Sequence, residues 1–259
     1  MVEEKIYHIS AVSYLNTKPF LYGIQASSIQ NQIRLSQDNP AQCAIHLLNN
    51  KIDIGLVPVA IIPLLSNAHI ISPFCIGANG YVKTVSLYAN VPIDEIQTVY
   101  LDEQSRTSVL LVQILFKEYW KKEVQFLPAY PNYENNIKNY EAAVVIGDRC
   151  IQLIDKYVYN YDLSYTWKQH TGLPFVFAAW VSNKILDNDF LLEFNHALEY
   201  GIQHKNILAE QYASYNTNSF DVLNYWTDNI IYKLDEDMKQ ALELFLRKIN
   251  PKQQIFYCF

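Results

Sequence analysis

The chain has 259 residues, of which 50% are hydrophobic and 18% are charged, and its formal net charge is -6. This composition predicts a globular protein with one large domain or two smaller ones. The acidic balance and the lack of a basic run argue against nucleic acid as a partner, and no apolar run is long enough to span a membrane.

The spacing of the cysteines and histidines does not match the common metal-site patterns. The four cysteines lie far apart and the six histidines form no pair at helical ligand spacing, so we expect reduced thiols and no bound metal. The first five residues are mostly charged and lead directly into a strand, without the apolar core of a signal peptide. These features predict a cytoplasmic protein.

The first third of the chain alternates predicted strands with predicted helices. Strands are expected over residues 6–9, 32–35 and 52–59, and helices from Pro19 onward, over 39–49 and, as a helix or turn, over 60–65. Short apolar runs and prolines near the helix starts support these assignments. The alternating order favours a parallel sheet covered by helices.

The middle third repeats this order. Strands are expected over residues 82–90, 98–102, 124–127 and 142–149, and helices over 109–122 and 150–156. After an apolar strand over 175–182, helices are expected over 187–215, 219–229 and 235–249.

The two long apolar strands, 82–90 and 175–182, bracket the middle third without a Gly/Ser/Pro-rich linker. We therefore expect residues 1–89 and 180–259 to form one discontinuous lobe, with residues 90–179 inserted as a second lobe. The cleft between two such lobes is a natural ligand site.

Four polar clusters fall at the ends of the predicted strands. They are Ser13-Asn16-Thr17, Thr84-Ser86, Ser105-Arg106-Thr107-Ser108 and Gly147-Asp148-Arg149. Hydroxyl groups and free N–H groups at a helix start can bind a carboxylate. The same residues are also ordinary N-caps, as Asn16 or Thr17 can be for the helix at Pro19, and Asp148 with Arg149 can be a local ion pair.

The familiar catalytic and nucleotide-binding motifs are missing. The sequence has no nucleophile elbow, phosphate loop or dinucleotide-binding glycine pattern, and it has only seven glycines. Read from its residues alone, the chain is a two-lobed α/β protein that binds a small anionic molecule.

Six segments resemble the chorismate dehydratases of the futalosine route to menaquinone. They are A-V-S-Y-L-N-T-K-P-F (11–20), D-I-G-L-V-P-V (53–59), T-V-S-L-Y-A-N-V-P (84–92), L-D-E-Q-S-R-T-S (101–108), V-I-G-D-R (145–149) and T-G-L-P-F-V-F-A-A-W (171–180). The resemblance covers the chain to about residue 182, and the helical remainder carries no comparable signature. It implies an α/β, two-lobed fold like that of type II periplasmic solute-binding proteins.

The resemblance implies an enzyme that removes water from chorismate, a dianion, to give 3-[(1-carboxyvinyl)oxy]benzoate without a cofactor. The ring C3 proton and the C4 hydroxyl leave, and formation of the aromatic ring drives the reaction. Asn16 and Ser86 are implied as the catalytic residues. Asn16 would hydrogen-bond the substrate hydroxyl or a carboxylate, because an amide is not a base at neutral pH.

The substrate-binding residues implied by the resemblance lie in all four polar clusters: Ser13, Thr84, Ser105, Arg106, Thr107, Ser108 and Asp148. The side chain of Arg106 can also point outward. The sequence does not identify the general base. Asp102 and Asp148 are candidates, and so is one of the substrate's own carboxylates, that of the enolpyruvyl group.

Two other functions are alternatives. The sister enzyme 1,4-dihydroxy-6-naphthoate synthase has the same fold, but the S-Y-L-N segment argues against it. A non-catalytic solute-binding or ligand-sensing protein for a small carboxylate would be expected to carry a signal peptide, a lipid-anchor cysteine or a DNA-binding domain, and none is recognised in the sequence.

Overall fold

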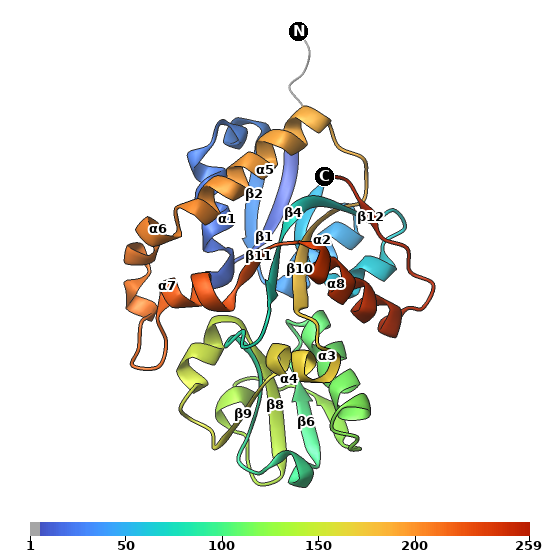
Figure 1. The fold of residues 1–259 in the computed structure, drawn as a ribbon, viewed down its shortest axis with the longest axis vertical. Helices are drawn as coiled ribbons and strands as arrows, with labels where there is room; N and C mark the ends of the chain where they lie inside the picture. The colour runs from blue at the N-terminus through green and yellow to red at the C-terminus, as the bar shows by residue number, and fades with distance from the viewer. Residues whose placement is uncertain (1–5) are drawn as a thin grey trace.

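The computed structural model describes residues 6–259, so the charged start of the chain lies outside the described residues. Two sheets organise these residues, one above the other in Figure 1. The upper sheet has seven strands in the order β11-β4-β10-β3-β1-β2, with β12 paired to β4. The lower sheet has five strands in the order β7-β6-β8-β5-β9.

The strands of the upper sheet come from both ends of the chain: β1 (Tyr7–Val12), β2 (Ile33–Asp38), β3 (Ile54–Pro58), β4 (His69–Ala78), β10 (Phe175–Ser182), β11 (Ile231–Lys233) and β12 (Phe256–Tyr257). The parallel pairing of β1 with β2 and β3 was predicted by the alternating order of strands and helices. The antiparallel insertion of β10 between β3 and β4 was not predicted.

The strands of the lower sheet come from the middle of the chain: β5 (Val85–Ala89), β6 (Thr98–Leu101), β7 (Gln125–Pro128), β8 (Glu141–Ile146) and β9 (Tyr159–Asp162). β6 is parallel to β7 and β8, whereas β5 is antiparallel to β8 and β9. We call residues 6–78 and 175–259 the large lobe and residues 85–171 the small lobe, after the sheet to which each contributes.

Helices surround both sheets: α1 (Lys18–Ala26), α2 (Pro40–Leu48), α3 (Arg106–Glu118), α4 (Leu163–Thr171), α5 (Asn188–Gln203), α6 (Lys205–Gln211), α7 (Val222–Asn224) and α8 (Glu236–Ile249). Short 3₁₀ turns precede or replace some helices, among them η1 (Leu15–Thr17) and η6 (Gly147–Leu153), and a π turn, η8 (Tyr225–Asn229), follows α7. Within the described residues, no helix is long and apolar enough to cross a membrane.

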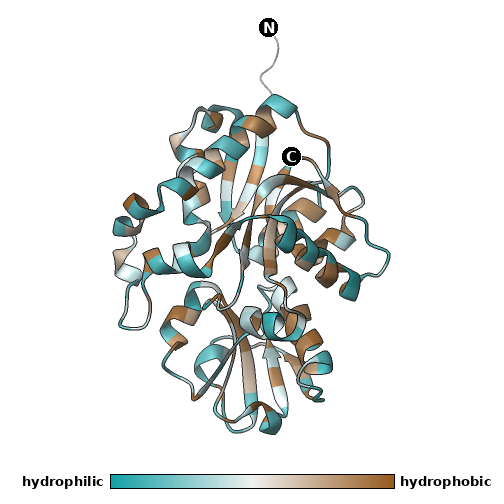
Figure 2. Cartoon of the chain, viewed as in Figure 1, coloured by the Kyte–Doolittle hydropathy of each residue, from teal (hydrophilic) through white to brown (hydrophobic). Residues whose placement is uncertain are grey.

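The expected lobe boundaries at residues 89/90 and 179/180 do not match the strand pairing. All of β5 pairs within the small lobe, and all of β10 pairs within the large lobe. The chain therefore crosses between the sheets over residues 79–84 and 172–174. Both strands are continuous apolar runs because central strands in covered sheets are buried on both faces, so their hydropathy does not reveal which sheet they join (Figure 2).

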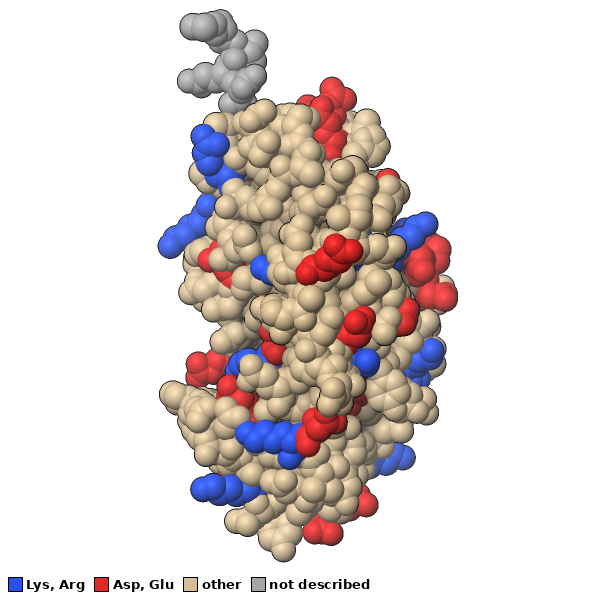
Figure 3. Space-filling model, turned by 90° about the vertical axis from the view of Figure 1, so that its left-hand side faces the viewer, with Lys and Arg blue, Asp and Glu red and all other residues tan. Residues whose placement is uncertain are grey.

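Local structure also differs from expectation elsewhere in the chain. The ten-residue strand β4 was missed, the 3₁₀ turn η6 and a following turn replace the helix expected over 150–156, and the helix expected over 187–215 breaks at His204. Strand β4 lies between β10 and β11, so its fit in the sheet depends on partners far away in sequence. On the face shown in Figure 3, acidic and basic side chains are interspersed without a basic tract.

Candidate active site

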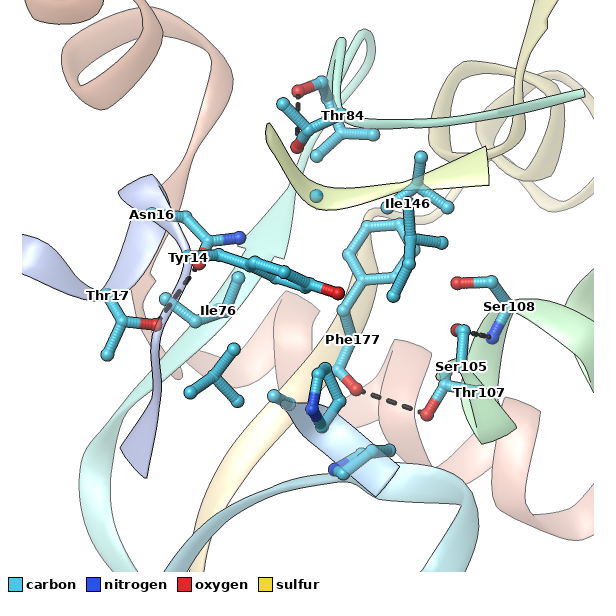
Figure 4. A pocket seen from close by; sticks show the side chains of 17 residues that line it. Tyr14, Asn16, Thr17, Ile76, Thr84, Ser105, Thr107, Ser108, Ile146 and Phe177 are labelled. Atoms are coloured by element: carbon cyan, nitrogen blue, oxygen red, sulfur yellow. Dashed lines mark hydrogen bonds between the residues drawn. The ribbon is translucent and has the colours of Figure 1, made fainter. Parts of the chain in front are cut away.

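A pocket lies between the two lobes and has a volume of about 60 Å³ (Figure 4). Its polar lining consists of Tyr14, Asn16, Thr17, Thr84, Ser105, Thr107 and Ser108, and much of the remaining lining is apolar, as with Val12, Ile76, Ile146 and Phe177. Among the described residues, no acidic, basic or histidine side chain lines the pocket. A cavity of this size holds only a few water molecules. Hydrogen bonds such as that from the Tyr14 hydroxyl to Gln104 join the lobes beside it, and we call this arrangement closed.

Asn16 is in the 3₁₀ turn η1, which connects β1 to α1. The Thr17 hydroxyl donates a hydrogen bond to Asn16 Oδ1 at 3.1 Å, and the amide nitrogen points into the pocket in Figure 4. The expected capping role of Asn16 or Thr17 is wrong, because Thr17 is the N-cap residue of α1 but makes no side-chain cap hydrogen bond, and the Thr17 hydroxyl is bonded to Asn16 instead.

The N-terminus of α3 forms the small-lobe side of the pocket. Ser105 is its N-cap, and its hydroxyl accepts the Ser108 N–H at 3.1 Å. The first N–H groups of a helix have no partner within it, and they carry a partial positive charge. The Ser108 hydroxyl lines the pocket and makes no hydrogen bond within the part of the chain that the structure describes.

Thr107 differs from its neighbours in this cluster. Its hydroxyl donates to the Phe177 carbonyl and accepts the Ala60 N–H, both at 3.2 Å. Phe177 and Ala60 belong to the large lobe, so these hydrogen bonds join the lobes. The Thr107 hydroxyl is thus engaged before any ligand is present.

A second helix N-terminus reaches the pocket at Pro40, the first residue of α2. Asn39 caps this helix by accepting the Gln42 N–H at 2.9 Å. Two helix N-termini, one from each lobe, therefore meet the same small cavity, which favours a negatively charged ligand.

Of the two hydroxyls expected on the strand at 82–90, Thr84 lines the pocket and Ser86 does not. Val85 lines the pocket, and successive side chains of a strand point to opposite faces, so Ser86 is directed away and is fully buried. Thr84 precedes β5, and its hydroxyl lies 2.7 Å from that of Tyr225 in the C-terminal part of the chain. The expectation that Ser86 lines the cleft is therefore wrong.

Tyr14 is a pocket residue that the sequence interpretation did not single out. Its ring lies against Gly147 of the small lobe, where an added Cβ would come within 2.6 Å of the ring, and Gly147 has a φ of +69°. Its hydroxyl donates to Gln104 Oε1 at 2.7 Å. Burial and the nearby Asp102 carboxylate raise the pKa of Tyr14, so the phenol stays protonated.

The remaining predicted residues do not line the pocket. The Asp148 carboxylate accepts the Leu15 N–H, and Arg149 pairs with Asp102 instead of with Asp148 as expected. Arg106 forms no ion pair among the described residues, and the backbone N–H of Ser13 donates to the Asp38 carbonyl. Neither Asp102 nor Asp148 is thus placed to act on a ligand in this pocket.

The two sheets and the pocket between them make a two-lobed α/β fold. A protein from Archaeoglobus fulgidus has a solved structure with a TM-score of 0.75 and 15% identity, covering 97% of this chain and 98% of that protein. A Candida albicans protein described as having the generic periplasmic binding protein fold gives a TM-score of 0.64 at 14% identity, covering 96% and 91%. The chain thus has a periplasmic-binding-protein-like fold.

The sequence comparison is more specific about the family. Residues 7–251 match the family model described as menaquinone biosynthesis, and the chain belongs to this family. A chorismate dehydratase from Thermus thermophilus is 23% identical over 280 aligned positions, which cover 97% of this chain and 98% of the relative.

Proposed function

We propose that this protein is a chorismate dehydratase, a lyase that acts on a small dicarboxylate in menaquinone biosynthesis. Membership of the menaquinone biosynthesis family and the similarity to a chorismate dehydratase over nearly the full chain support this function. The observation that carries the proposal is the interlobe pocket, which the Asn16 amide lines from one side and the hydroxyls at the N-terminus of α3 line from the other.

The lining suits a dianion although it carries no formal charge. Hydrogen bonds from neutral donors and two helix N-termini can each stabilise a carboxylate in a site closed to water. Ser108 and the first N–H groups of α3 are the proposed donors to one carboxylate. Without a fixed cation in the pocket, the site stabilises negative charge by dipoles aimed at it, which need no reorganisation as charge develops on the ring carboxylate.

The residues that line the pocket also indicate which group acts as the general base. Since no carboxylate, histidine or lysine of the described chain lines the pocket, we propose that the substrate's enolpyruvyl carboxylate takes the C3 proton. The C–O bond at C4 then breaks, the hydroxide takes this proton from the enolpyruvyl carboxyl group and leaves as water, and the ring becomes aromatic. Asn16 Nδ2 would donate a hydrogen bond to the C4 oxygen as its negative charge develops. Thr84 lines the pocket and Ser86 does not, so Thr84 would contact the substrate from the segment that crosses between the lobes.

Incubation of the purified protein with chorismate tests this function. We expect an aromatic product that is lighter than chorismate by one water, detected by ultraviolet absorbance and mass spectrometry, and a much slower reaction with Asn16→Ala. Binding of chorismate without any product would instead indicate a solute-binding or sensing protein. Absence of both binding and turnover would contradict the proposed substrate.

A further inference from the structure

The loop that carries Asn16 is bonded to the small lobe through Asp148. The backbone N–H of Leu15 donates to the Asp148 carboxylate, with distances of 2.9 Å to Oδ1 and 3.2 Å to Oδ2. Leu15 is fully buried and directly precedes Asn16. Asp148 follows Gly147, against which the ring of Tyr14 lies. Tyr14 and Leu15, the two residues before Asn16, thus both contact the Gly147-Asp148 turn of the small lobe.

The same loop has two further anchors, which come from its own lobe. Trp226 Nε1 donates to the Leu15 carbonyl, and the Tyr232 hydroxyl donates to the Asn16 carbonyl, both at 2.9 Å. These hydrogen bonds lie within the large lobe and do not depend on the position of the small lobe. The Leu15 N–H, by contrast, is bonded across the gap between the lobes, so its acceptor is present only when the lobes are closed.

The surroundings of Asp148 fit a structural contact better than a reaction with the ligand. Its side chain does not line the pocket. Burial raises the pKa of Asp148, while the Leu15 N–H and the nearby Lys18 ammonium oppose this effect. Both oxygens of the carboxylate accept the Leu15 N–H, so the carboxylate binds the loop that carries Asn16.

We propose that Asp148 is a positioning residue, which aligns the Asn16 amide by accepting the Leu15 N–H when the lobes close. Lobe separation removes this acceptor and leaves the loop held at its carbonyl groups alone. The amide is then aligned whenever the lobes are closed, so that closure over a substrate and catalysis are coupled. The inference rests on the proposed function because it gives Asn16 a role in the reaction.

Three variants separate positioning from proton transfer. Asp148→Ala removes the acceptor and is expected to lower kcat by roughly tenfold to a hundredfold, with KM changed by less than about threefold. Asp148→Asn keeps an oxygen that can accept the Leu15 N–H, so it should recover most of this loss. If Asp148 were the base, the Asn variant would be at least as inactive as the Ala variant, and that result would overturn the proposal.

Asp155→Ala is the matched control. Asp155 also accepts a hydrogen bond across the lobes, from the Ser219 hydroxyl at 2.6 Å, but it does not line the pocket and makes no bond to the loop. This variant should retain the wild-type kcat. An equal loss in both Ala variants would mean that any interlobe hydrogen bond matters equally, and it would exclude a specific role for Asp148.

A double-mutant cycle with Asn16→Ala tests whether Asp148 acts through Asn16. In the Asn16→Ala background, Asp148→Ala should lower kcat by less than about twofold, because the amide to be aligned is gone. Fully additive losses would show that the two residues act independently and would overturn the proposal.

Amide hydrogen exchange of the ligand-free protein provides a readout that does not depend on the substrate. The Leu15 N–H should exchange roughly tenfold or more faster in Asp148→Ala than in the wild type or in Asp155→Ala. Unchanged exchange would overturn the positioning role whatever the substrate is. If the wild type does not convert chorismate but the exchange differs as expected, the proposed function fails while the contact between Asp148 and the loop stands.

Discussion

The two polar sides of the pocket are held in place in different ways. On the small-lobe side, the Ser105 hydroxyl accepts the N–H of Ser108, three residues along the chain. On the large-lobe side, the turn that carries Asn16 is bonded to Asp148, Trp226 and Tyr232, which are 133 to 216 residues away. One side is thus a helix cap that forms locally, whereas the other exists only once the whole chain has folded.

This difference shows where each side can be altered. A helix cap can lose one hydroxyl and keep its helix, because α3 buries an apolar face formed by Leu111, Val112, Leu115 and Phe116. The Asn16 turn has no comparable local support. We therefore expect changes on the helix side to affect mainly binding, and changes on the turn side to affect turnover and stability together.

The largest effect is expected at Asn16 itself. Asn16→Ala should lower kcat by roughly a hundredfold to a thousandfold with little change in KM, as for a contact made in the transition state. Asn16→Asp should also bind chorismate poorly, since it adds a negative charge beside a dianion. Steady-state kinetics and a binding titration measure both effects. Near wild-type turnover of the Asp variant would show that Asn16 is a structural residue.

The second prediction separates Ser108 from Thr107. Ser108→Ala removes a hydroxyl that is free for a ligand, so KM should rise by roughly tenfold to a hundredfold with an unchanged melting temperature. Thr107→Val removes the hydroxyl that joins Ala60 to Phe177, so its main effect should be a lower melting temperature. Steady-state kinetics and thermal unfolding of both variants distinguish the two roles. The reverse pattern would assign ligand binding to Thr107.

The third prediction weakens the Asn16 turn from within the large lobe. Trp226→Phe removes one of two donors to the buried Leu15 carbonyl, which also accepts the Lys18 N–H, so it should lower the free energy of unfolding by about 0.5–1.5 kcal/mol and also lower kcat. Trp180→Phe is a matched control, because the indole N–H of the equally buried Trp180 has no hydrogen-bond partner in the described chain. A similar loss in both variants would attribute the effect to packing alone.

The last prediction concerns Asp162, which combines a local and a distant contact. Its carboxylate caps α4 and also accepts the N–H of Lys83, in the segment that crosses between the lobes. Burial raises the pKa of Asp162 to about 6. The folded state therefore binds this proton more tightly than the unfolded state does, and the associated stability is lost as the pH rises from about 4 to about 6.

Unfolding of the wild type and of Asp162→Asn across this range measures the contribution. The wild type should lose up to about 1.4 kcal/mol per pH unit relative to the variant. Parallel stability curves for the two proteins would contradict the raised pKa of Asp162.

Features that depend on nearby residues could be predicted from the sequence alone. These include the caps at Asn39 and Ser105, the alternation of strands and helices, and the placement of Asn16 and Ser108 beside a cleft. Hydrogen-bonding side chains at a helix start and short apolar runs act over a few residues, so their effect is visible in the order of the chain.

Features that depend on pairing between distant segments were decided by the tertiary structure. The sheets to which β5 and β10 belong, the direction of the buried Ser86 away from the pocket and the partners of Asp148 and Arg149 are of this kind. A continuous apolar strand fits either sheet, and a carboxylate can meet any N–H that the fold brings to it. The Asn16 turn is the clearest case, since the residues that hold it lie beyond any local pattern.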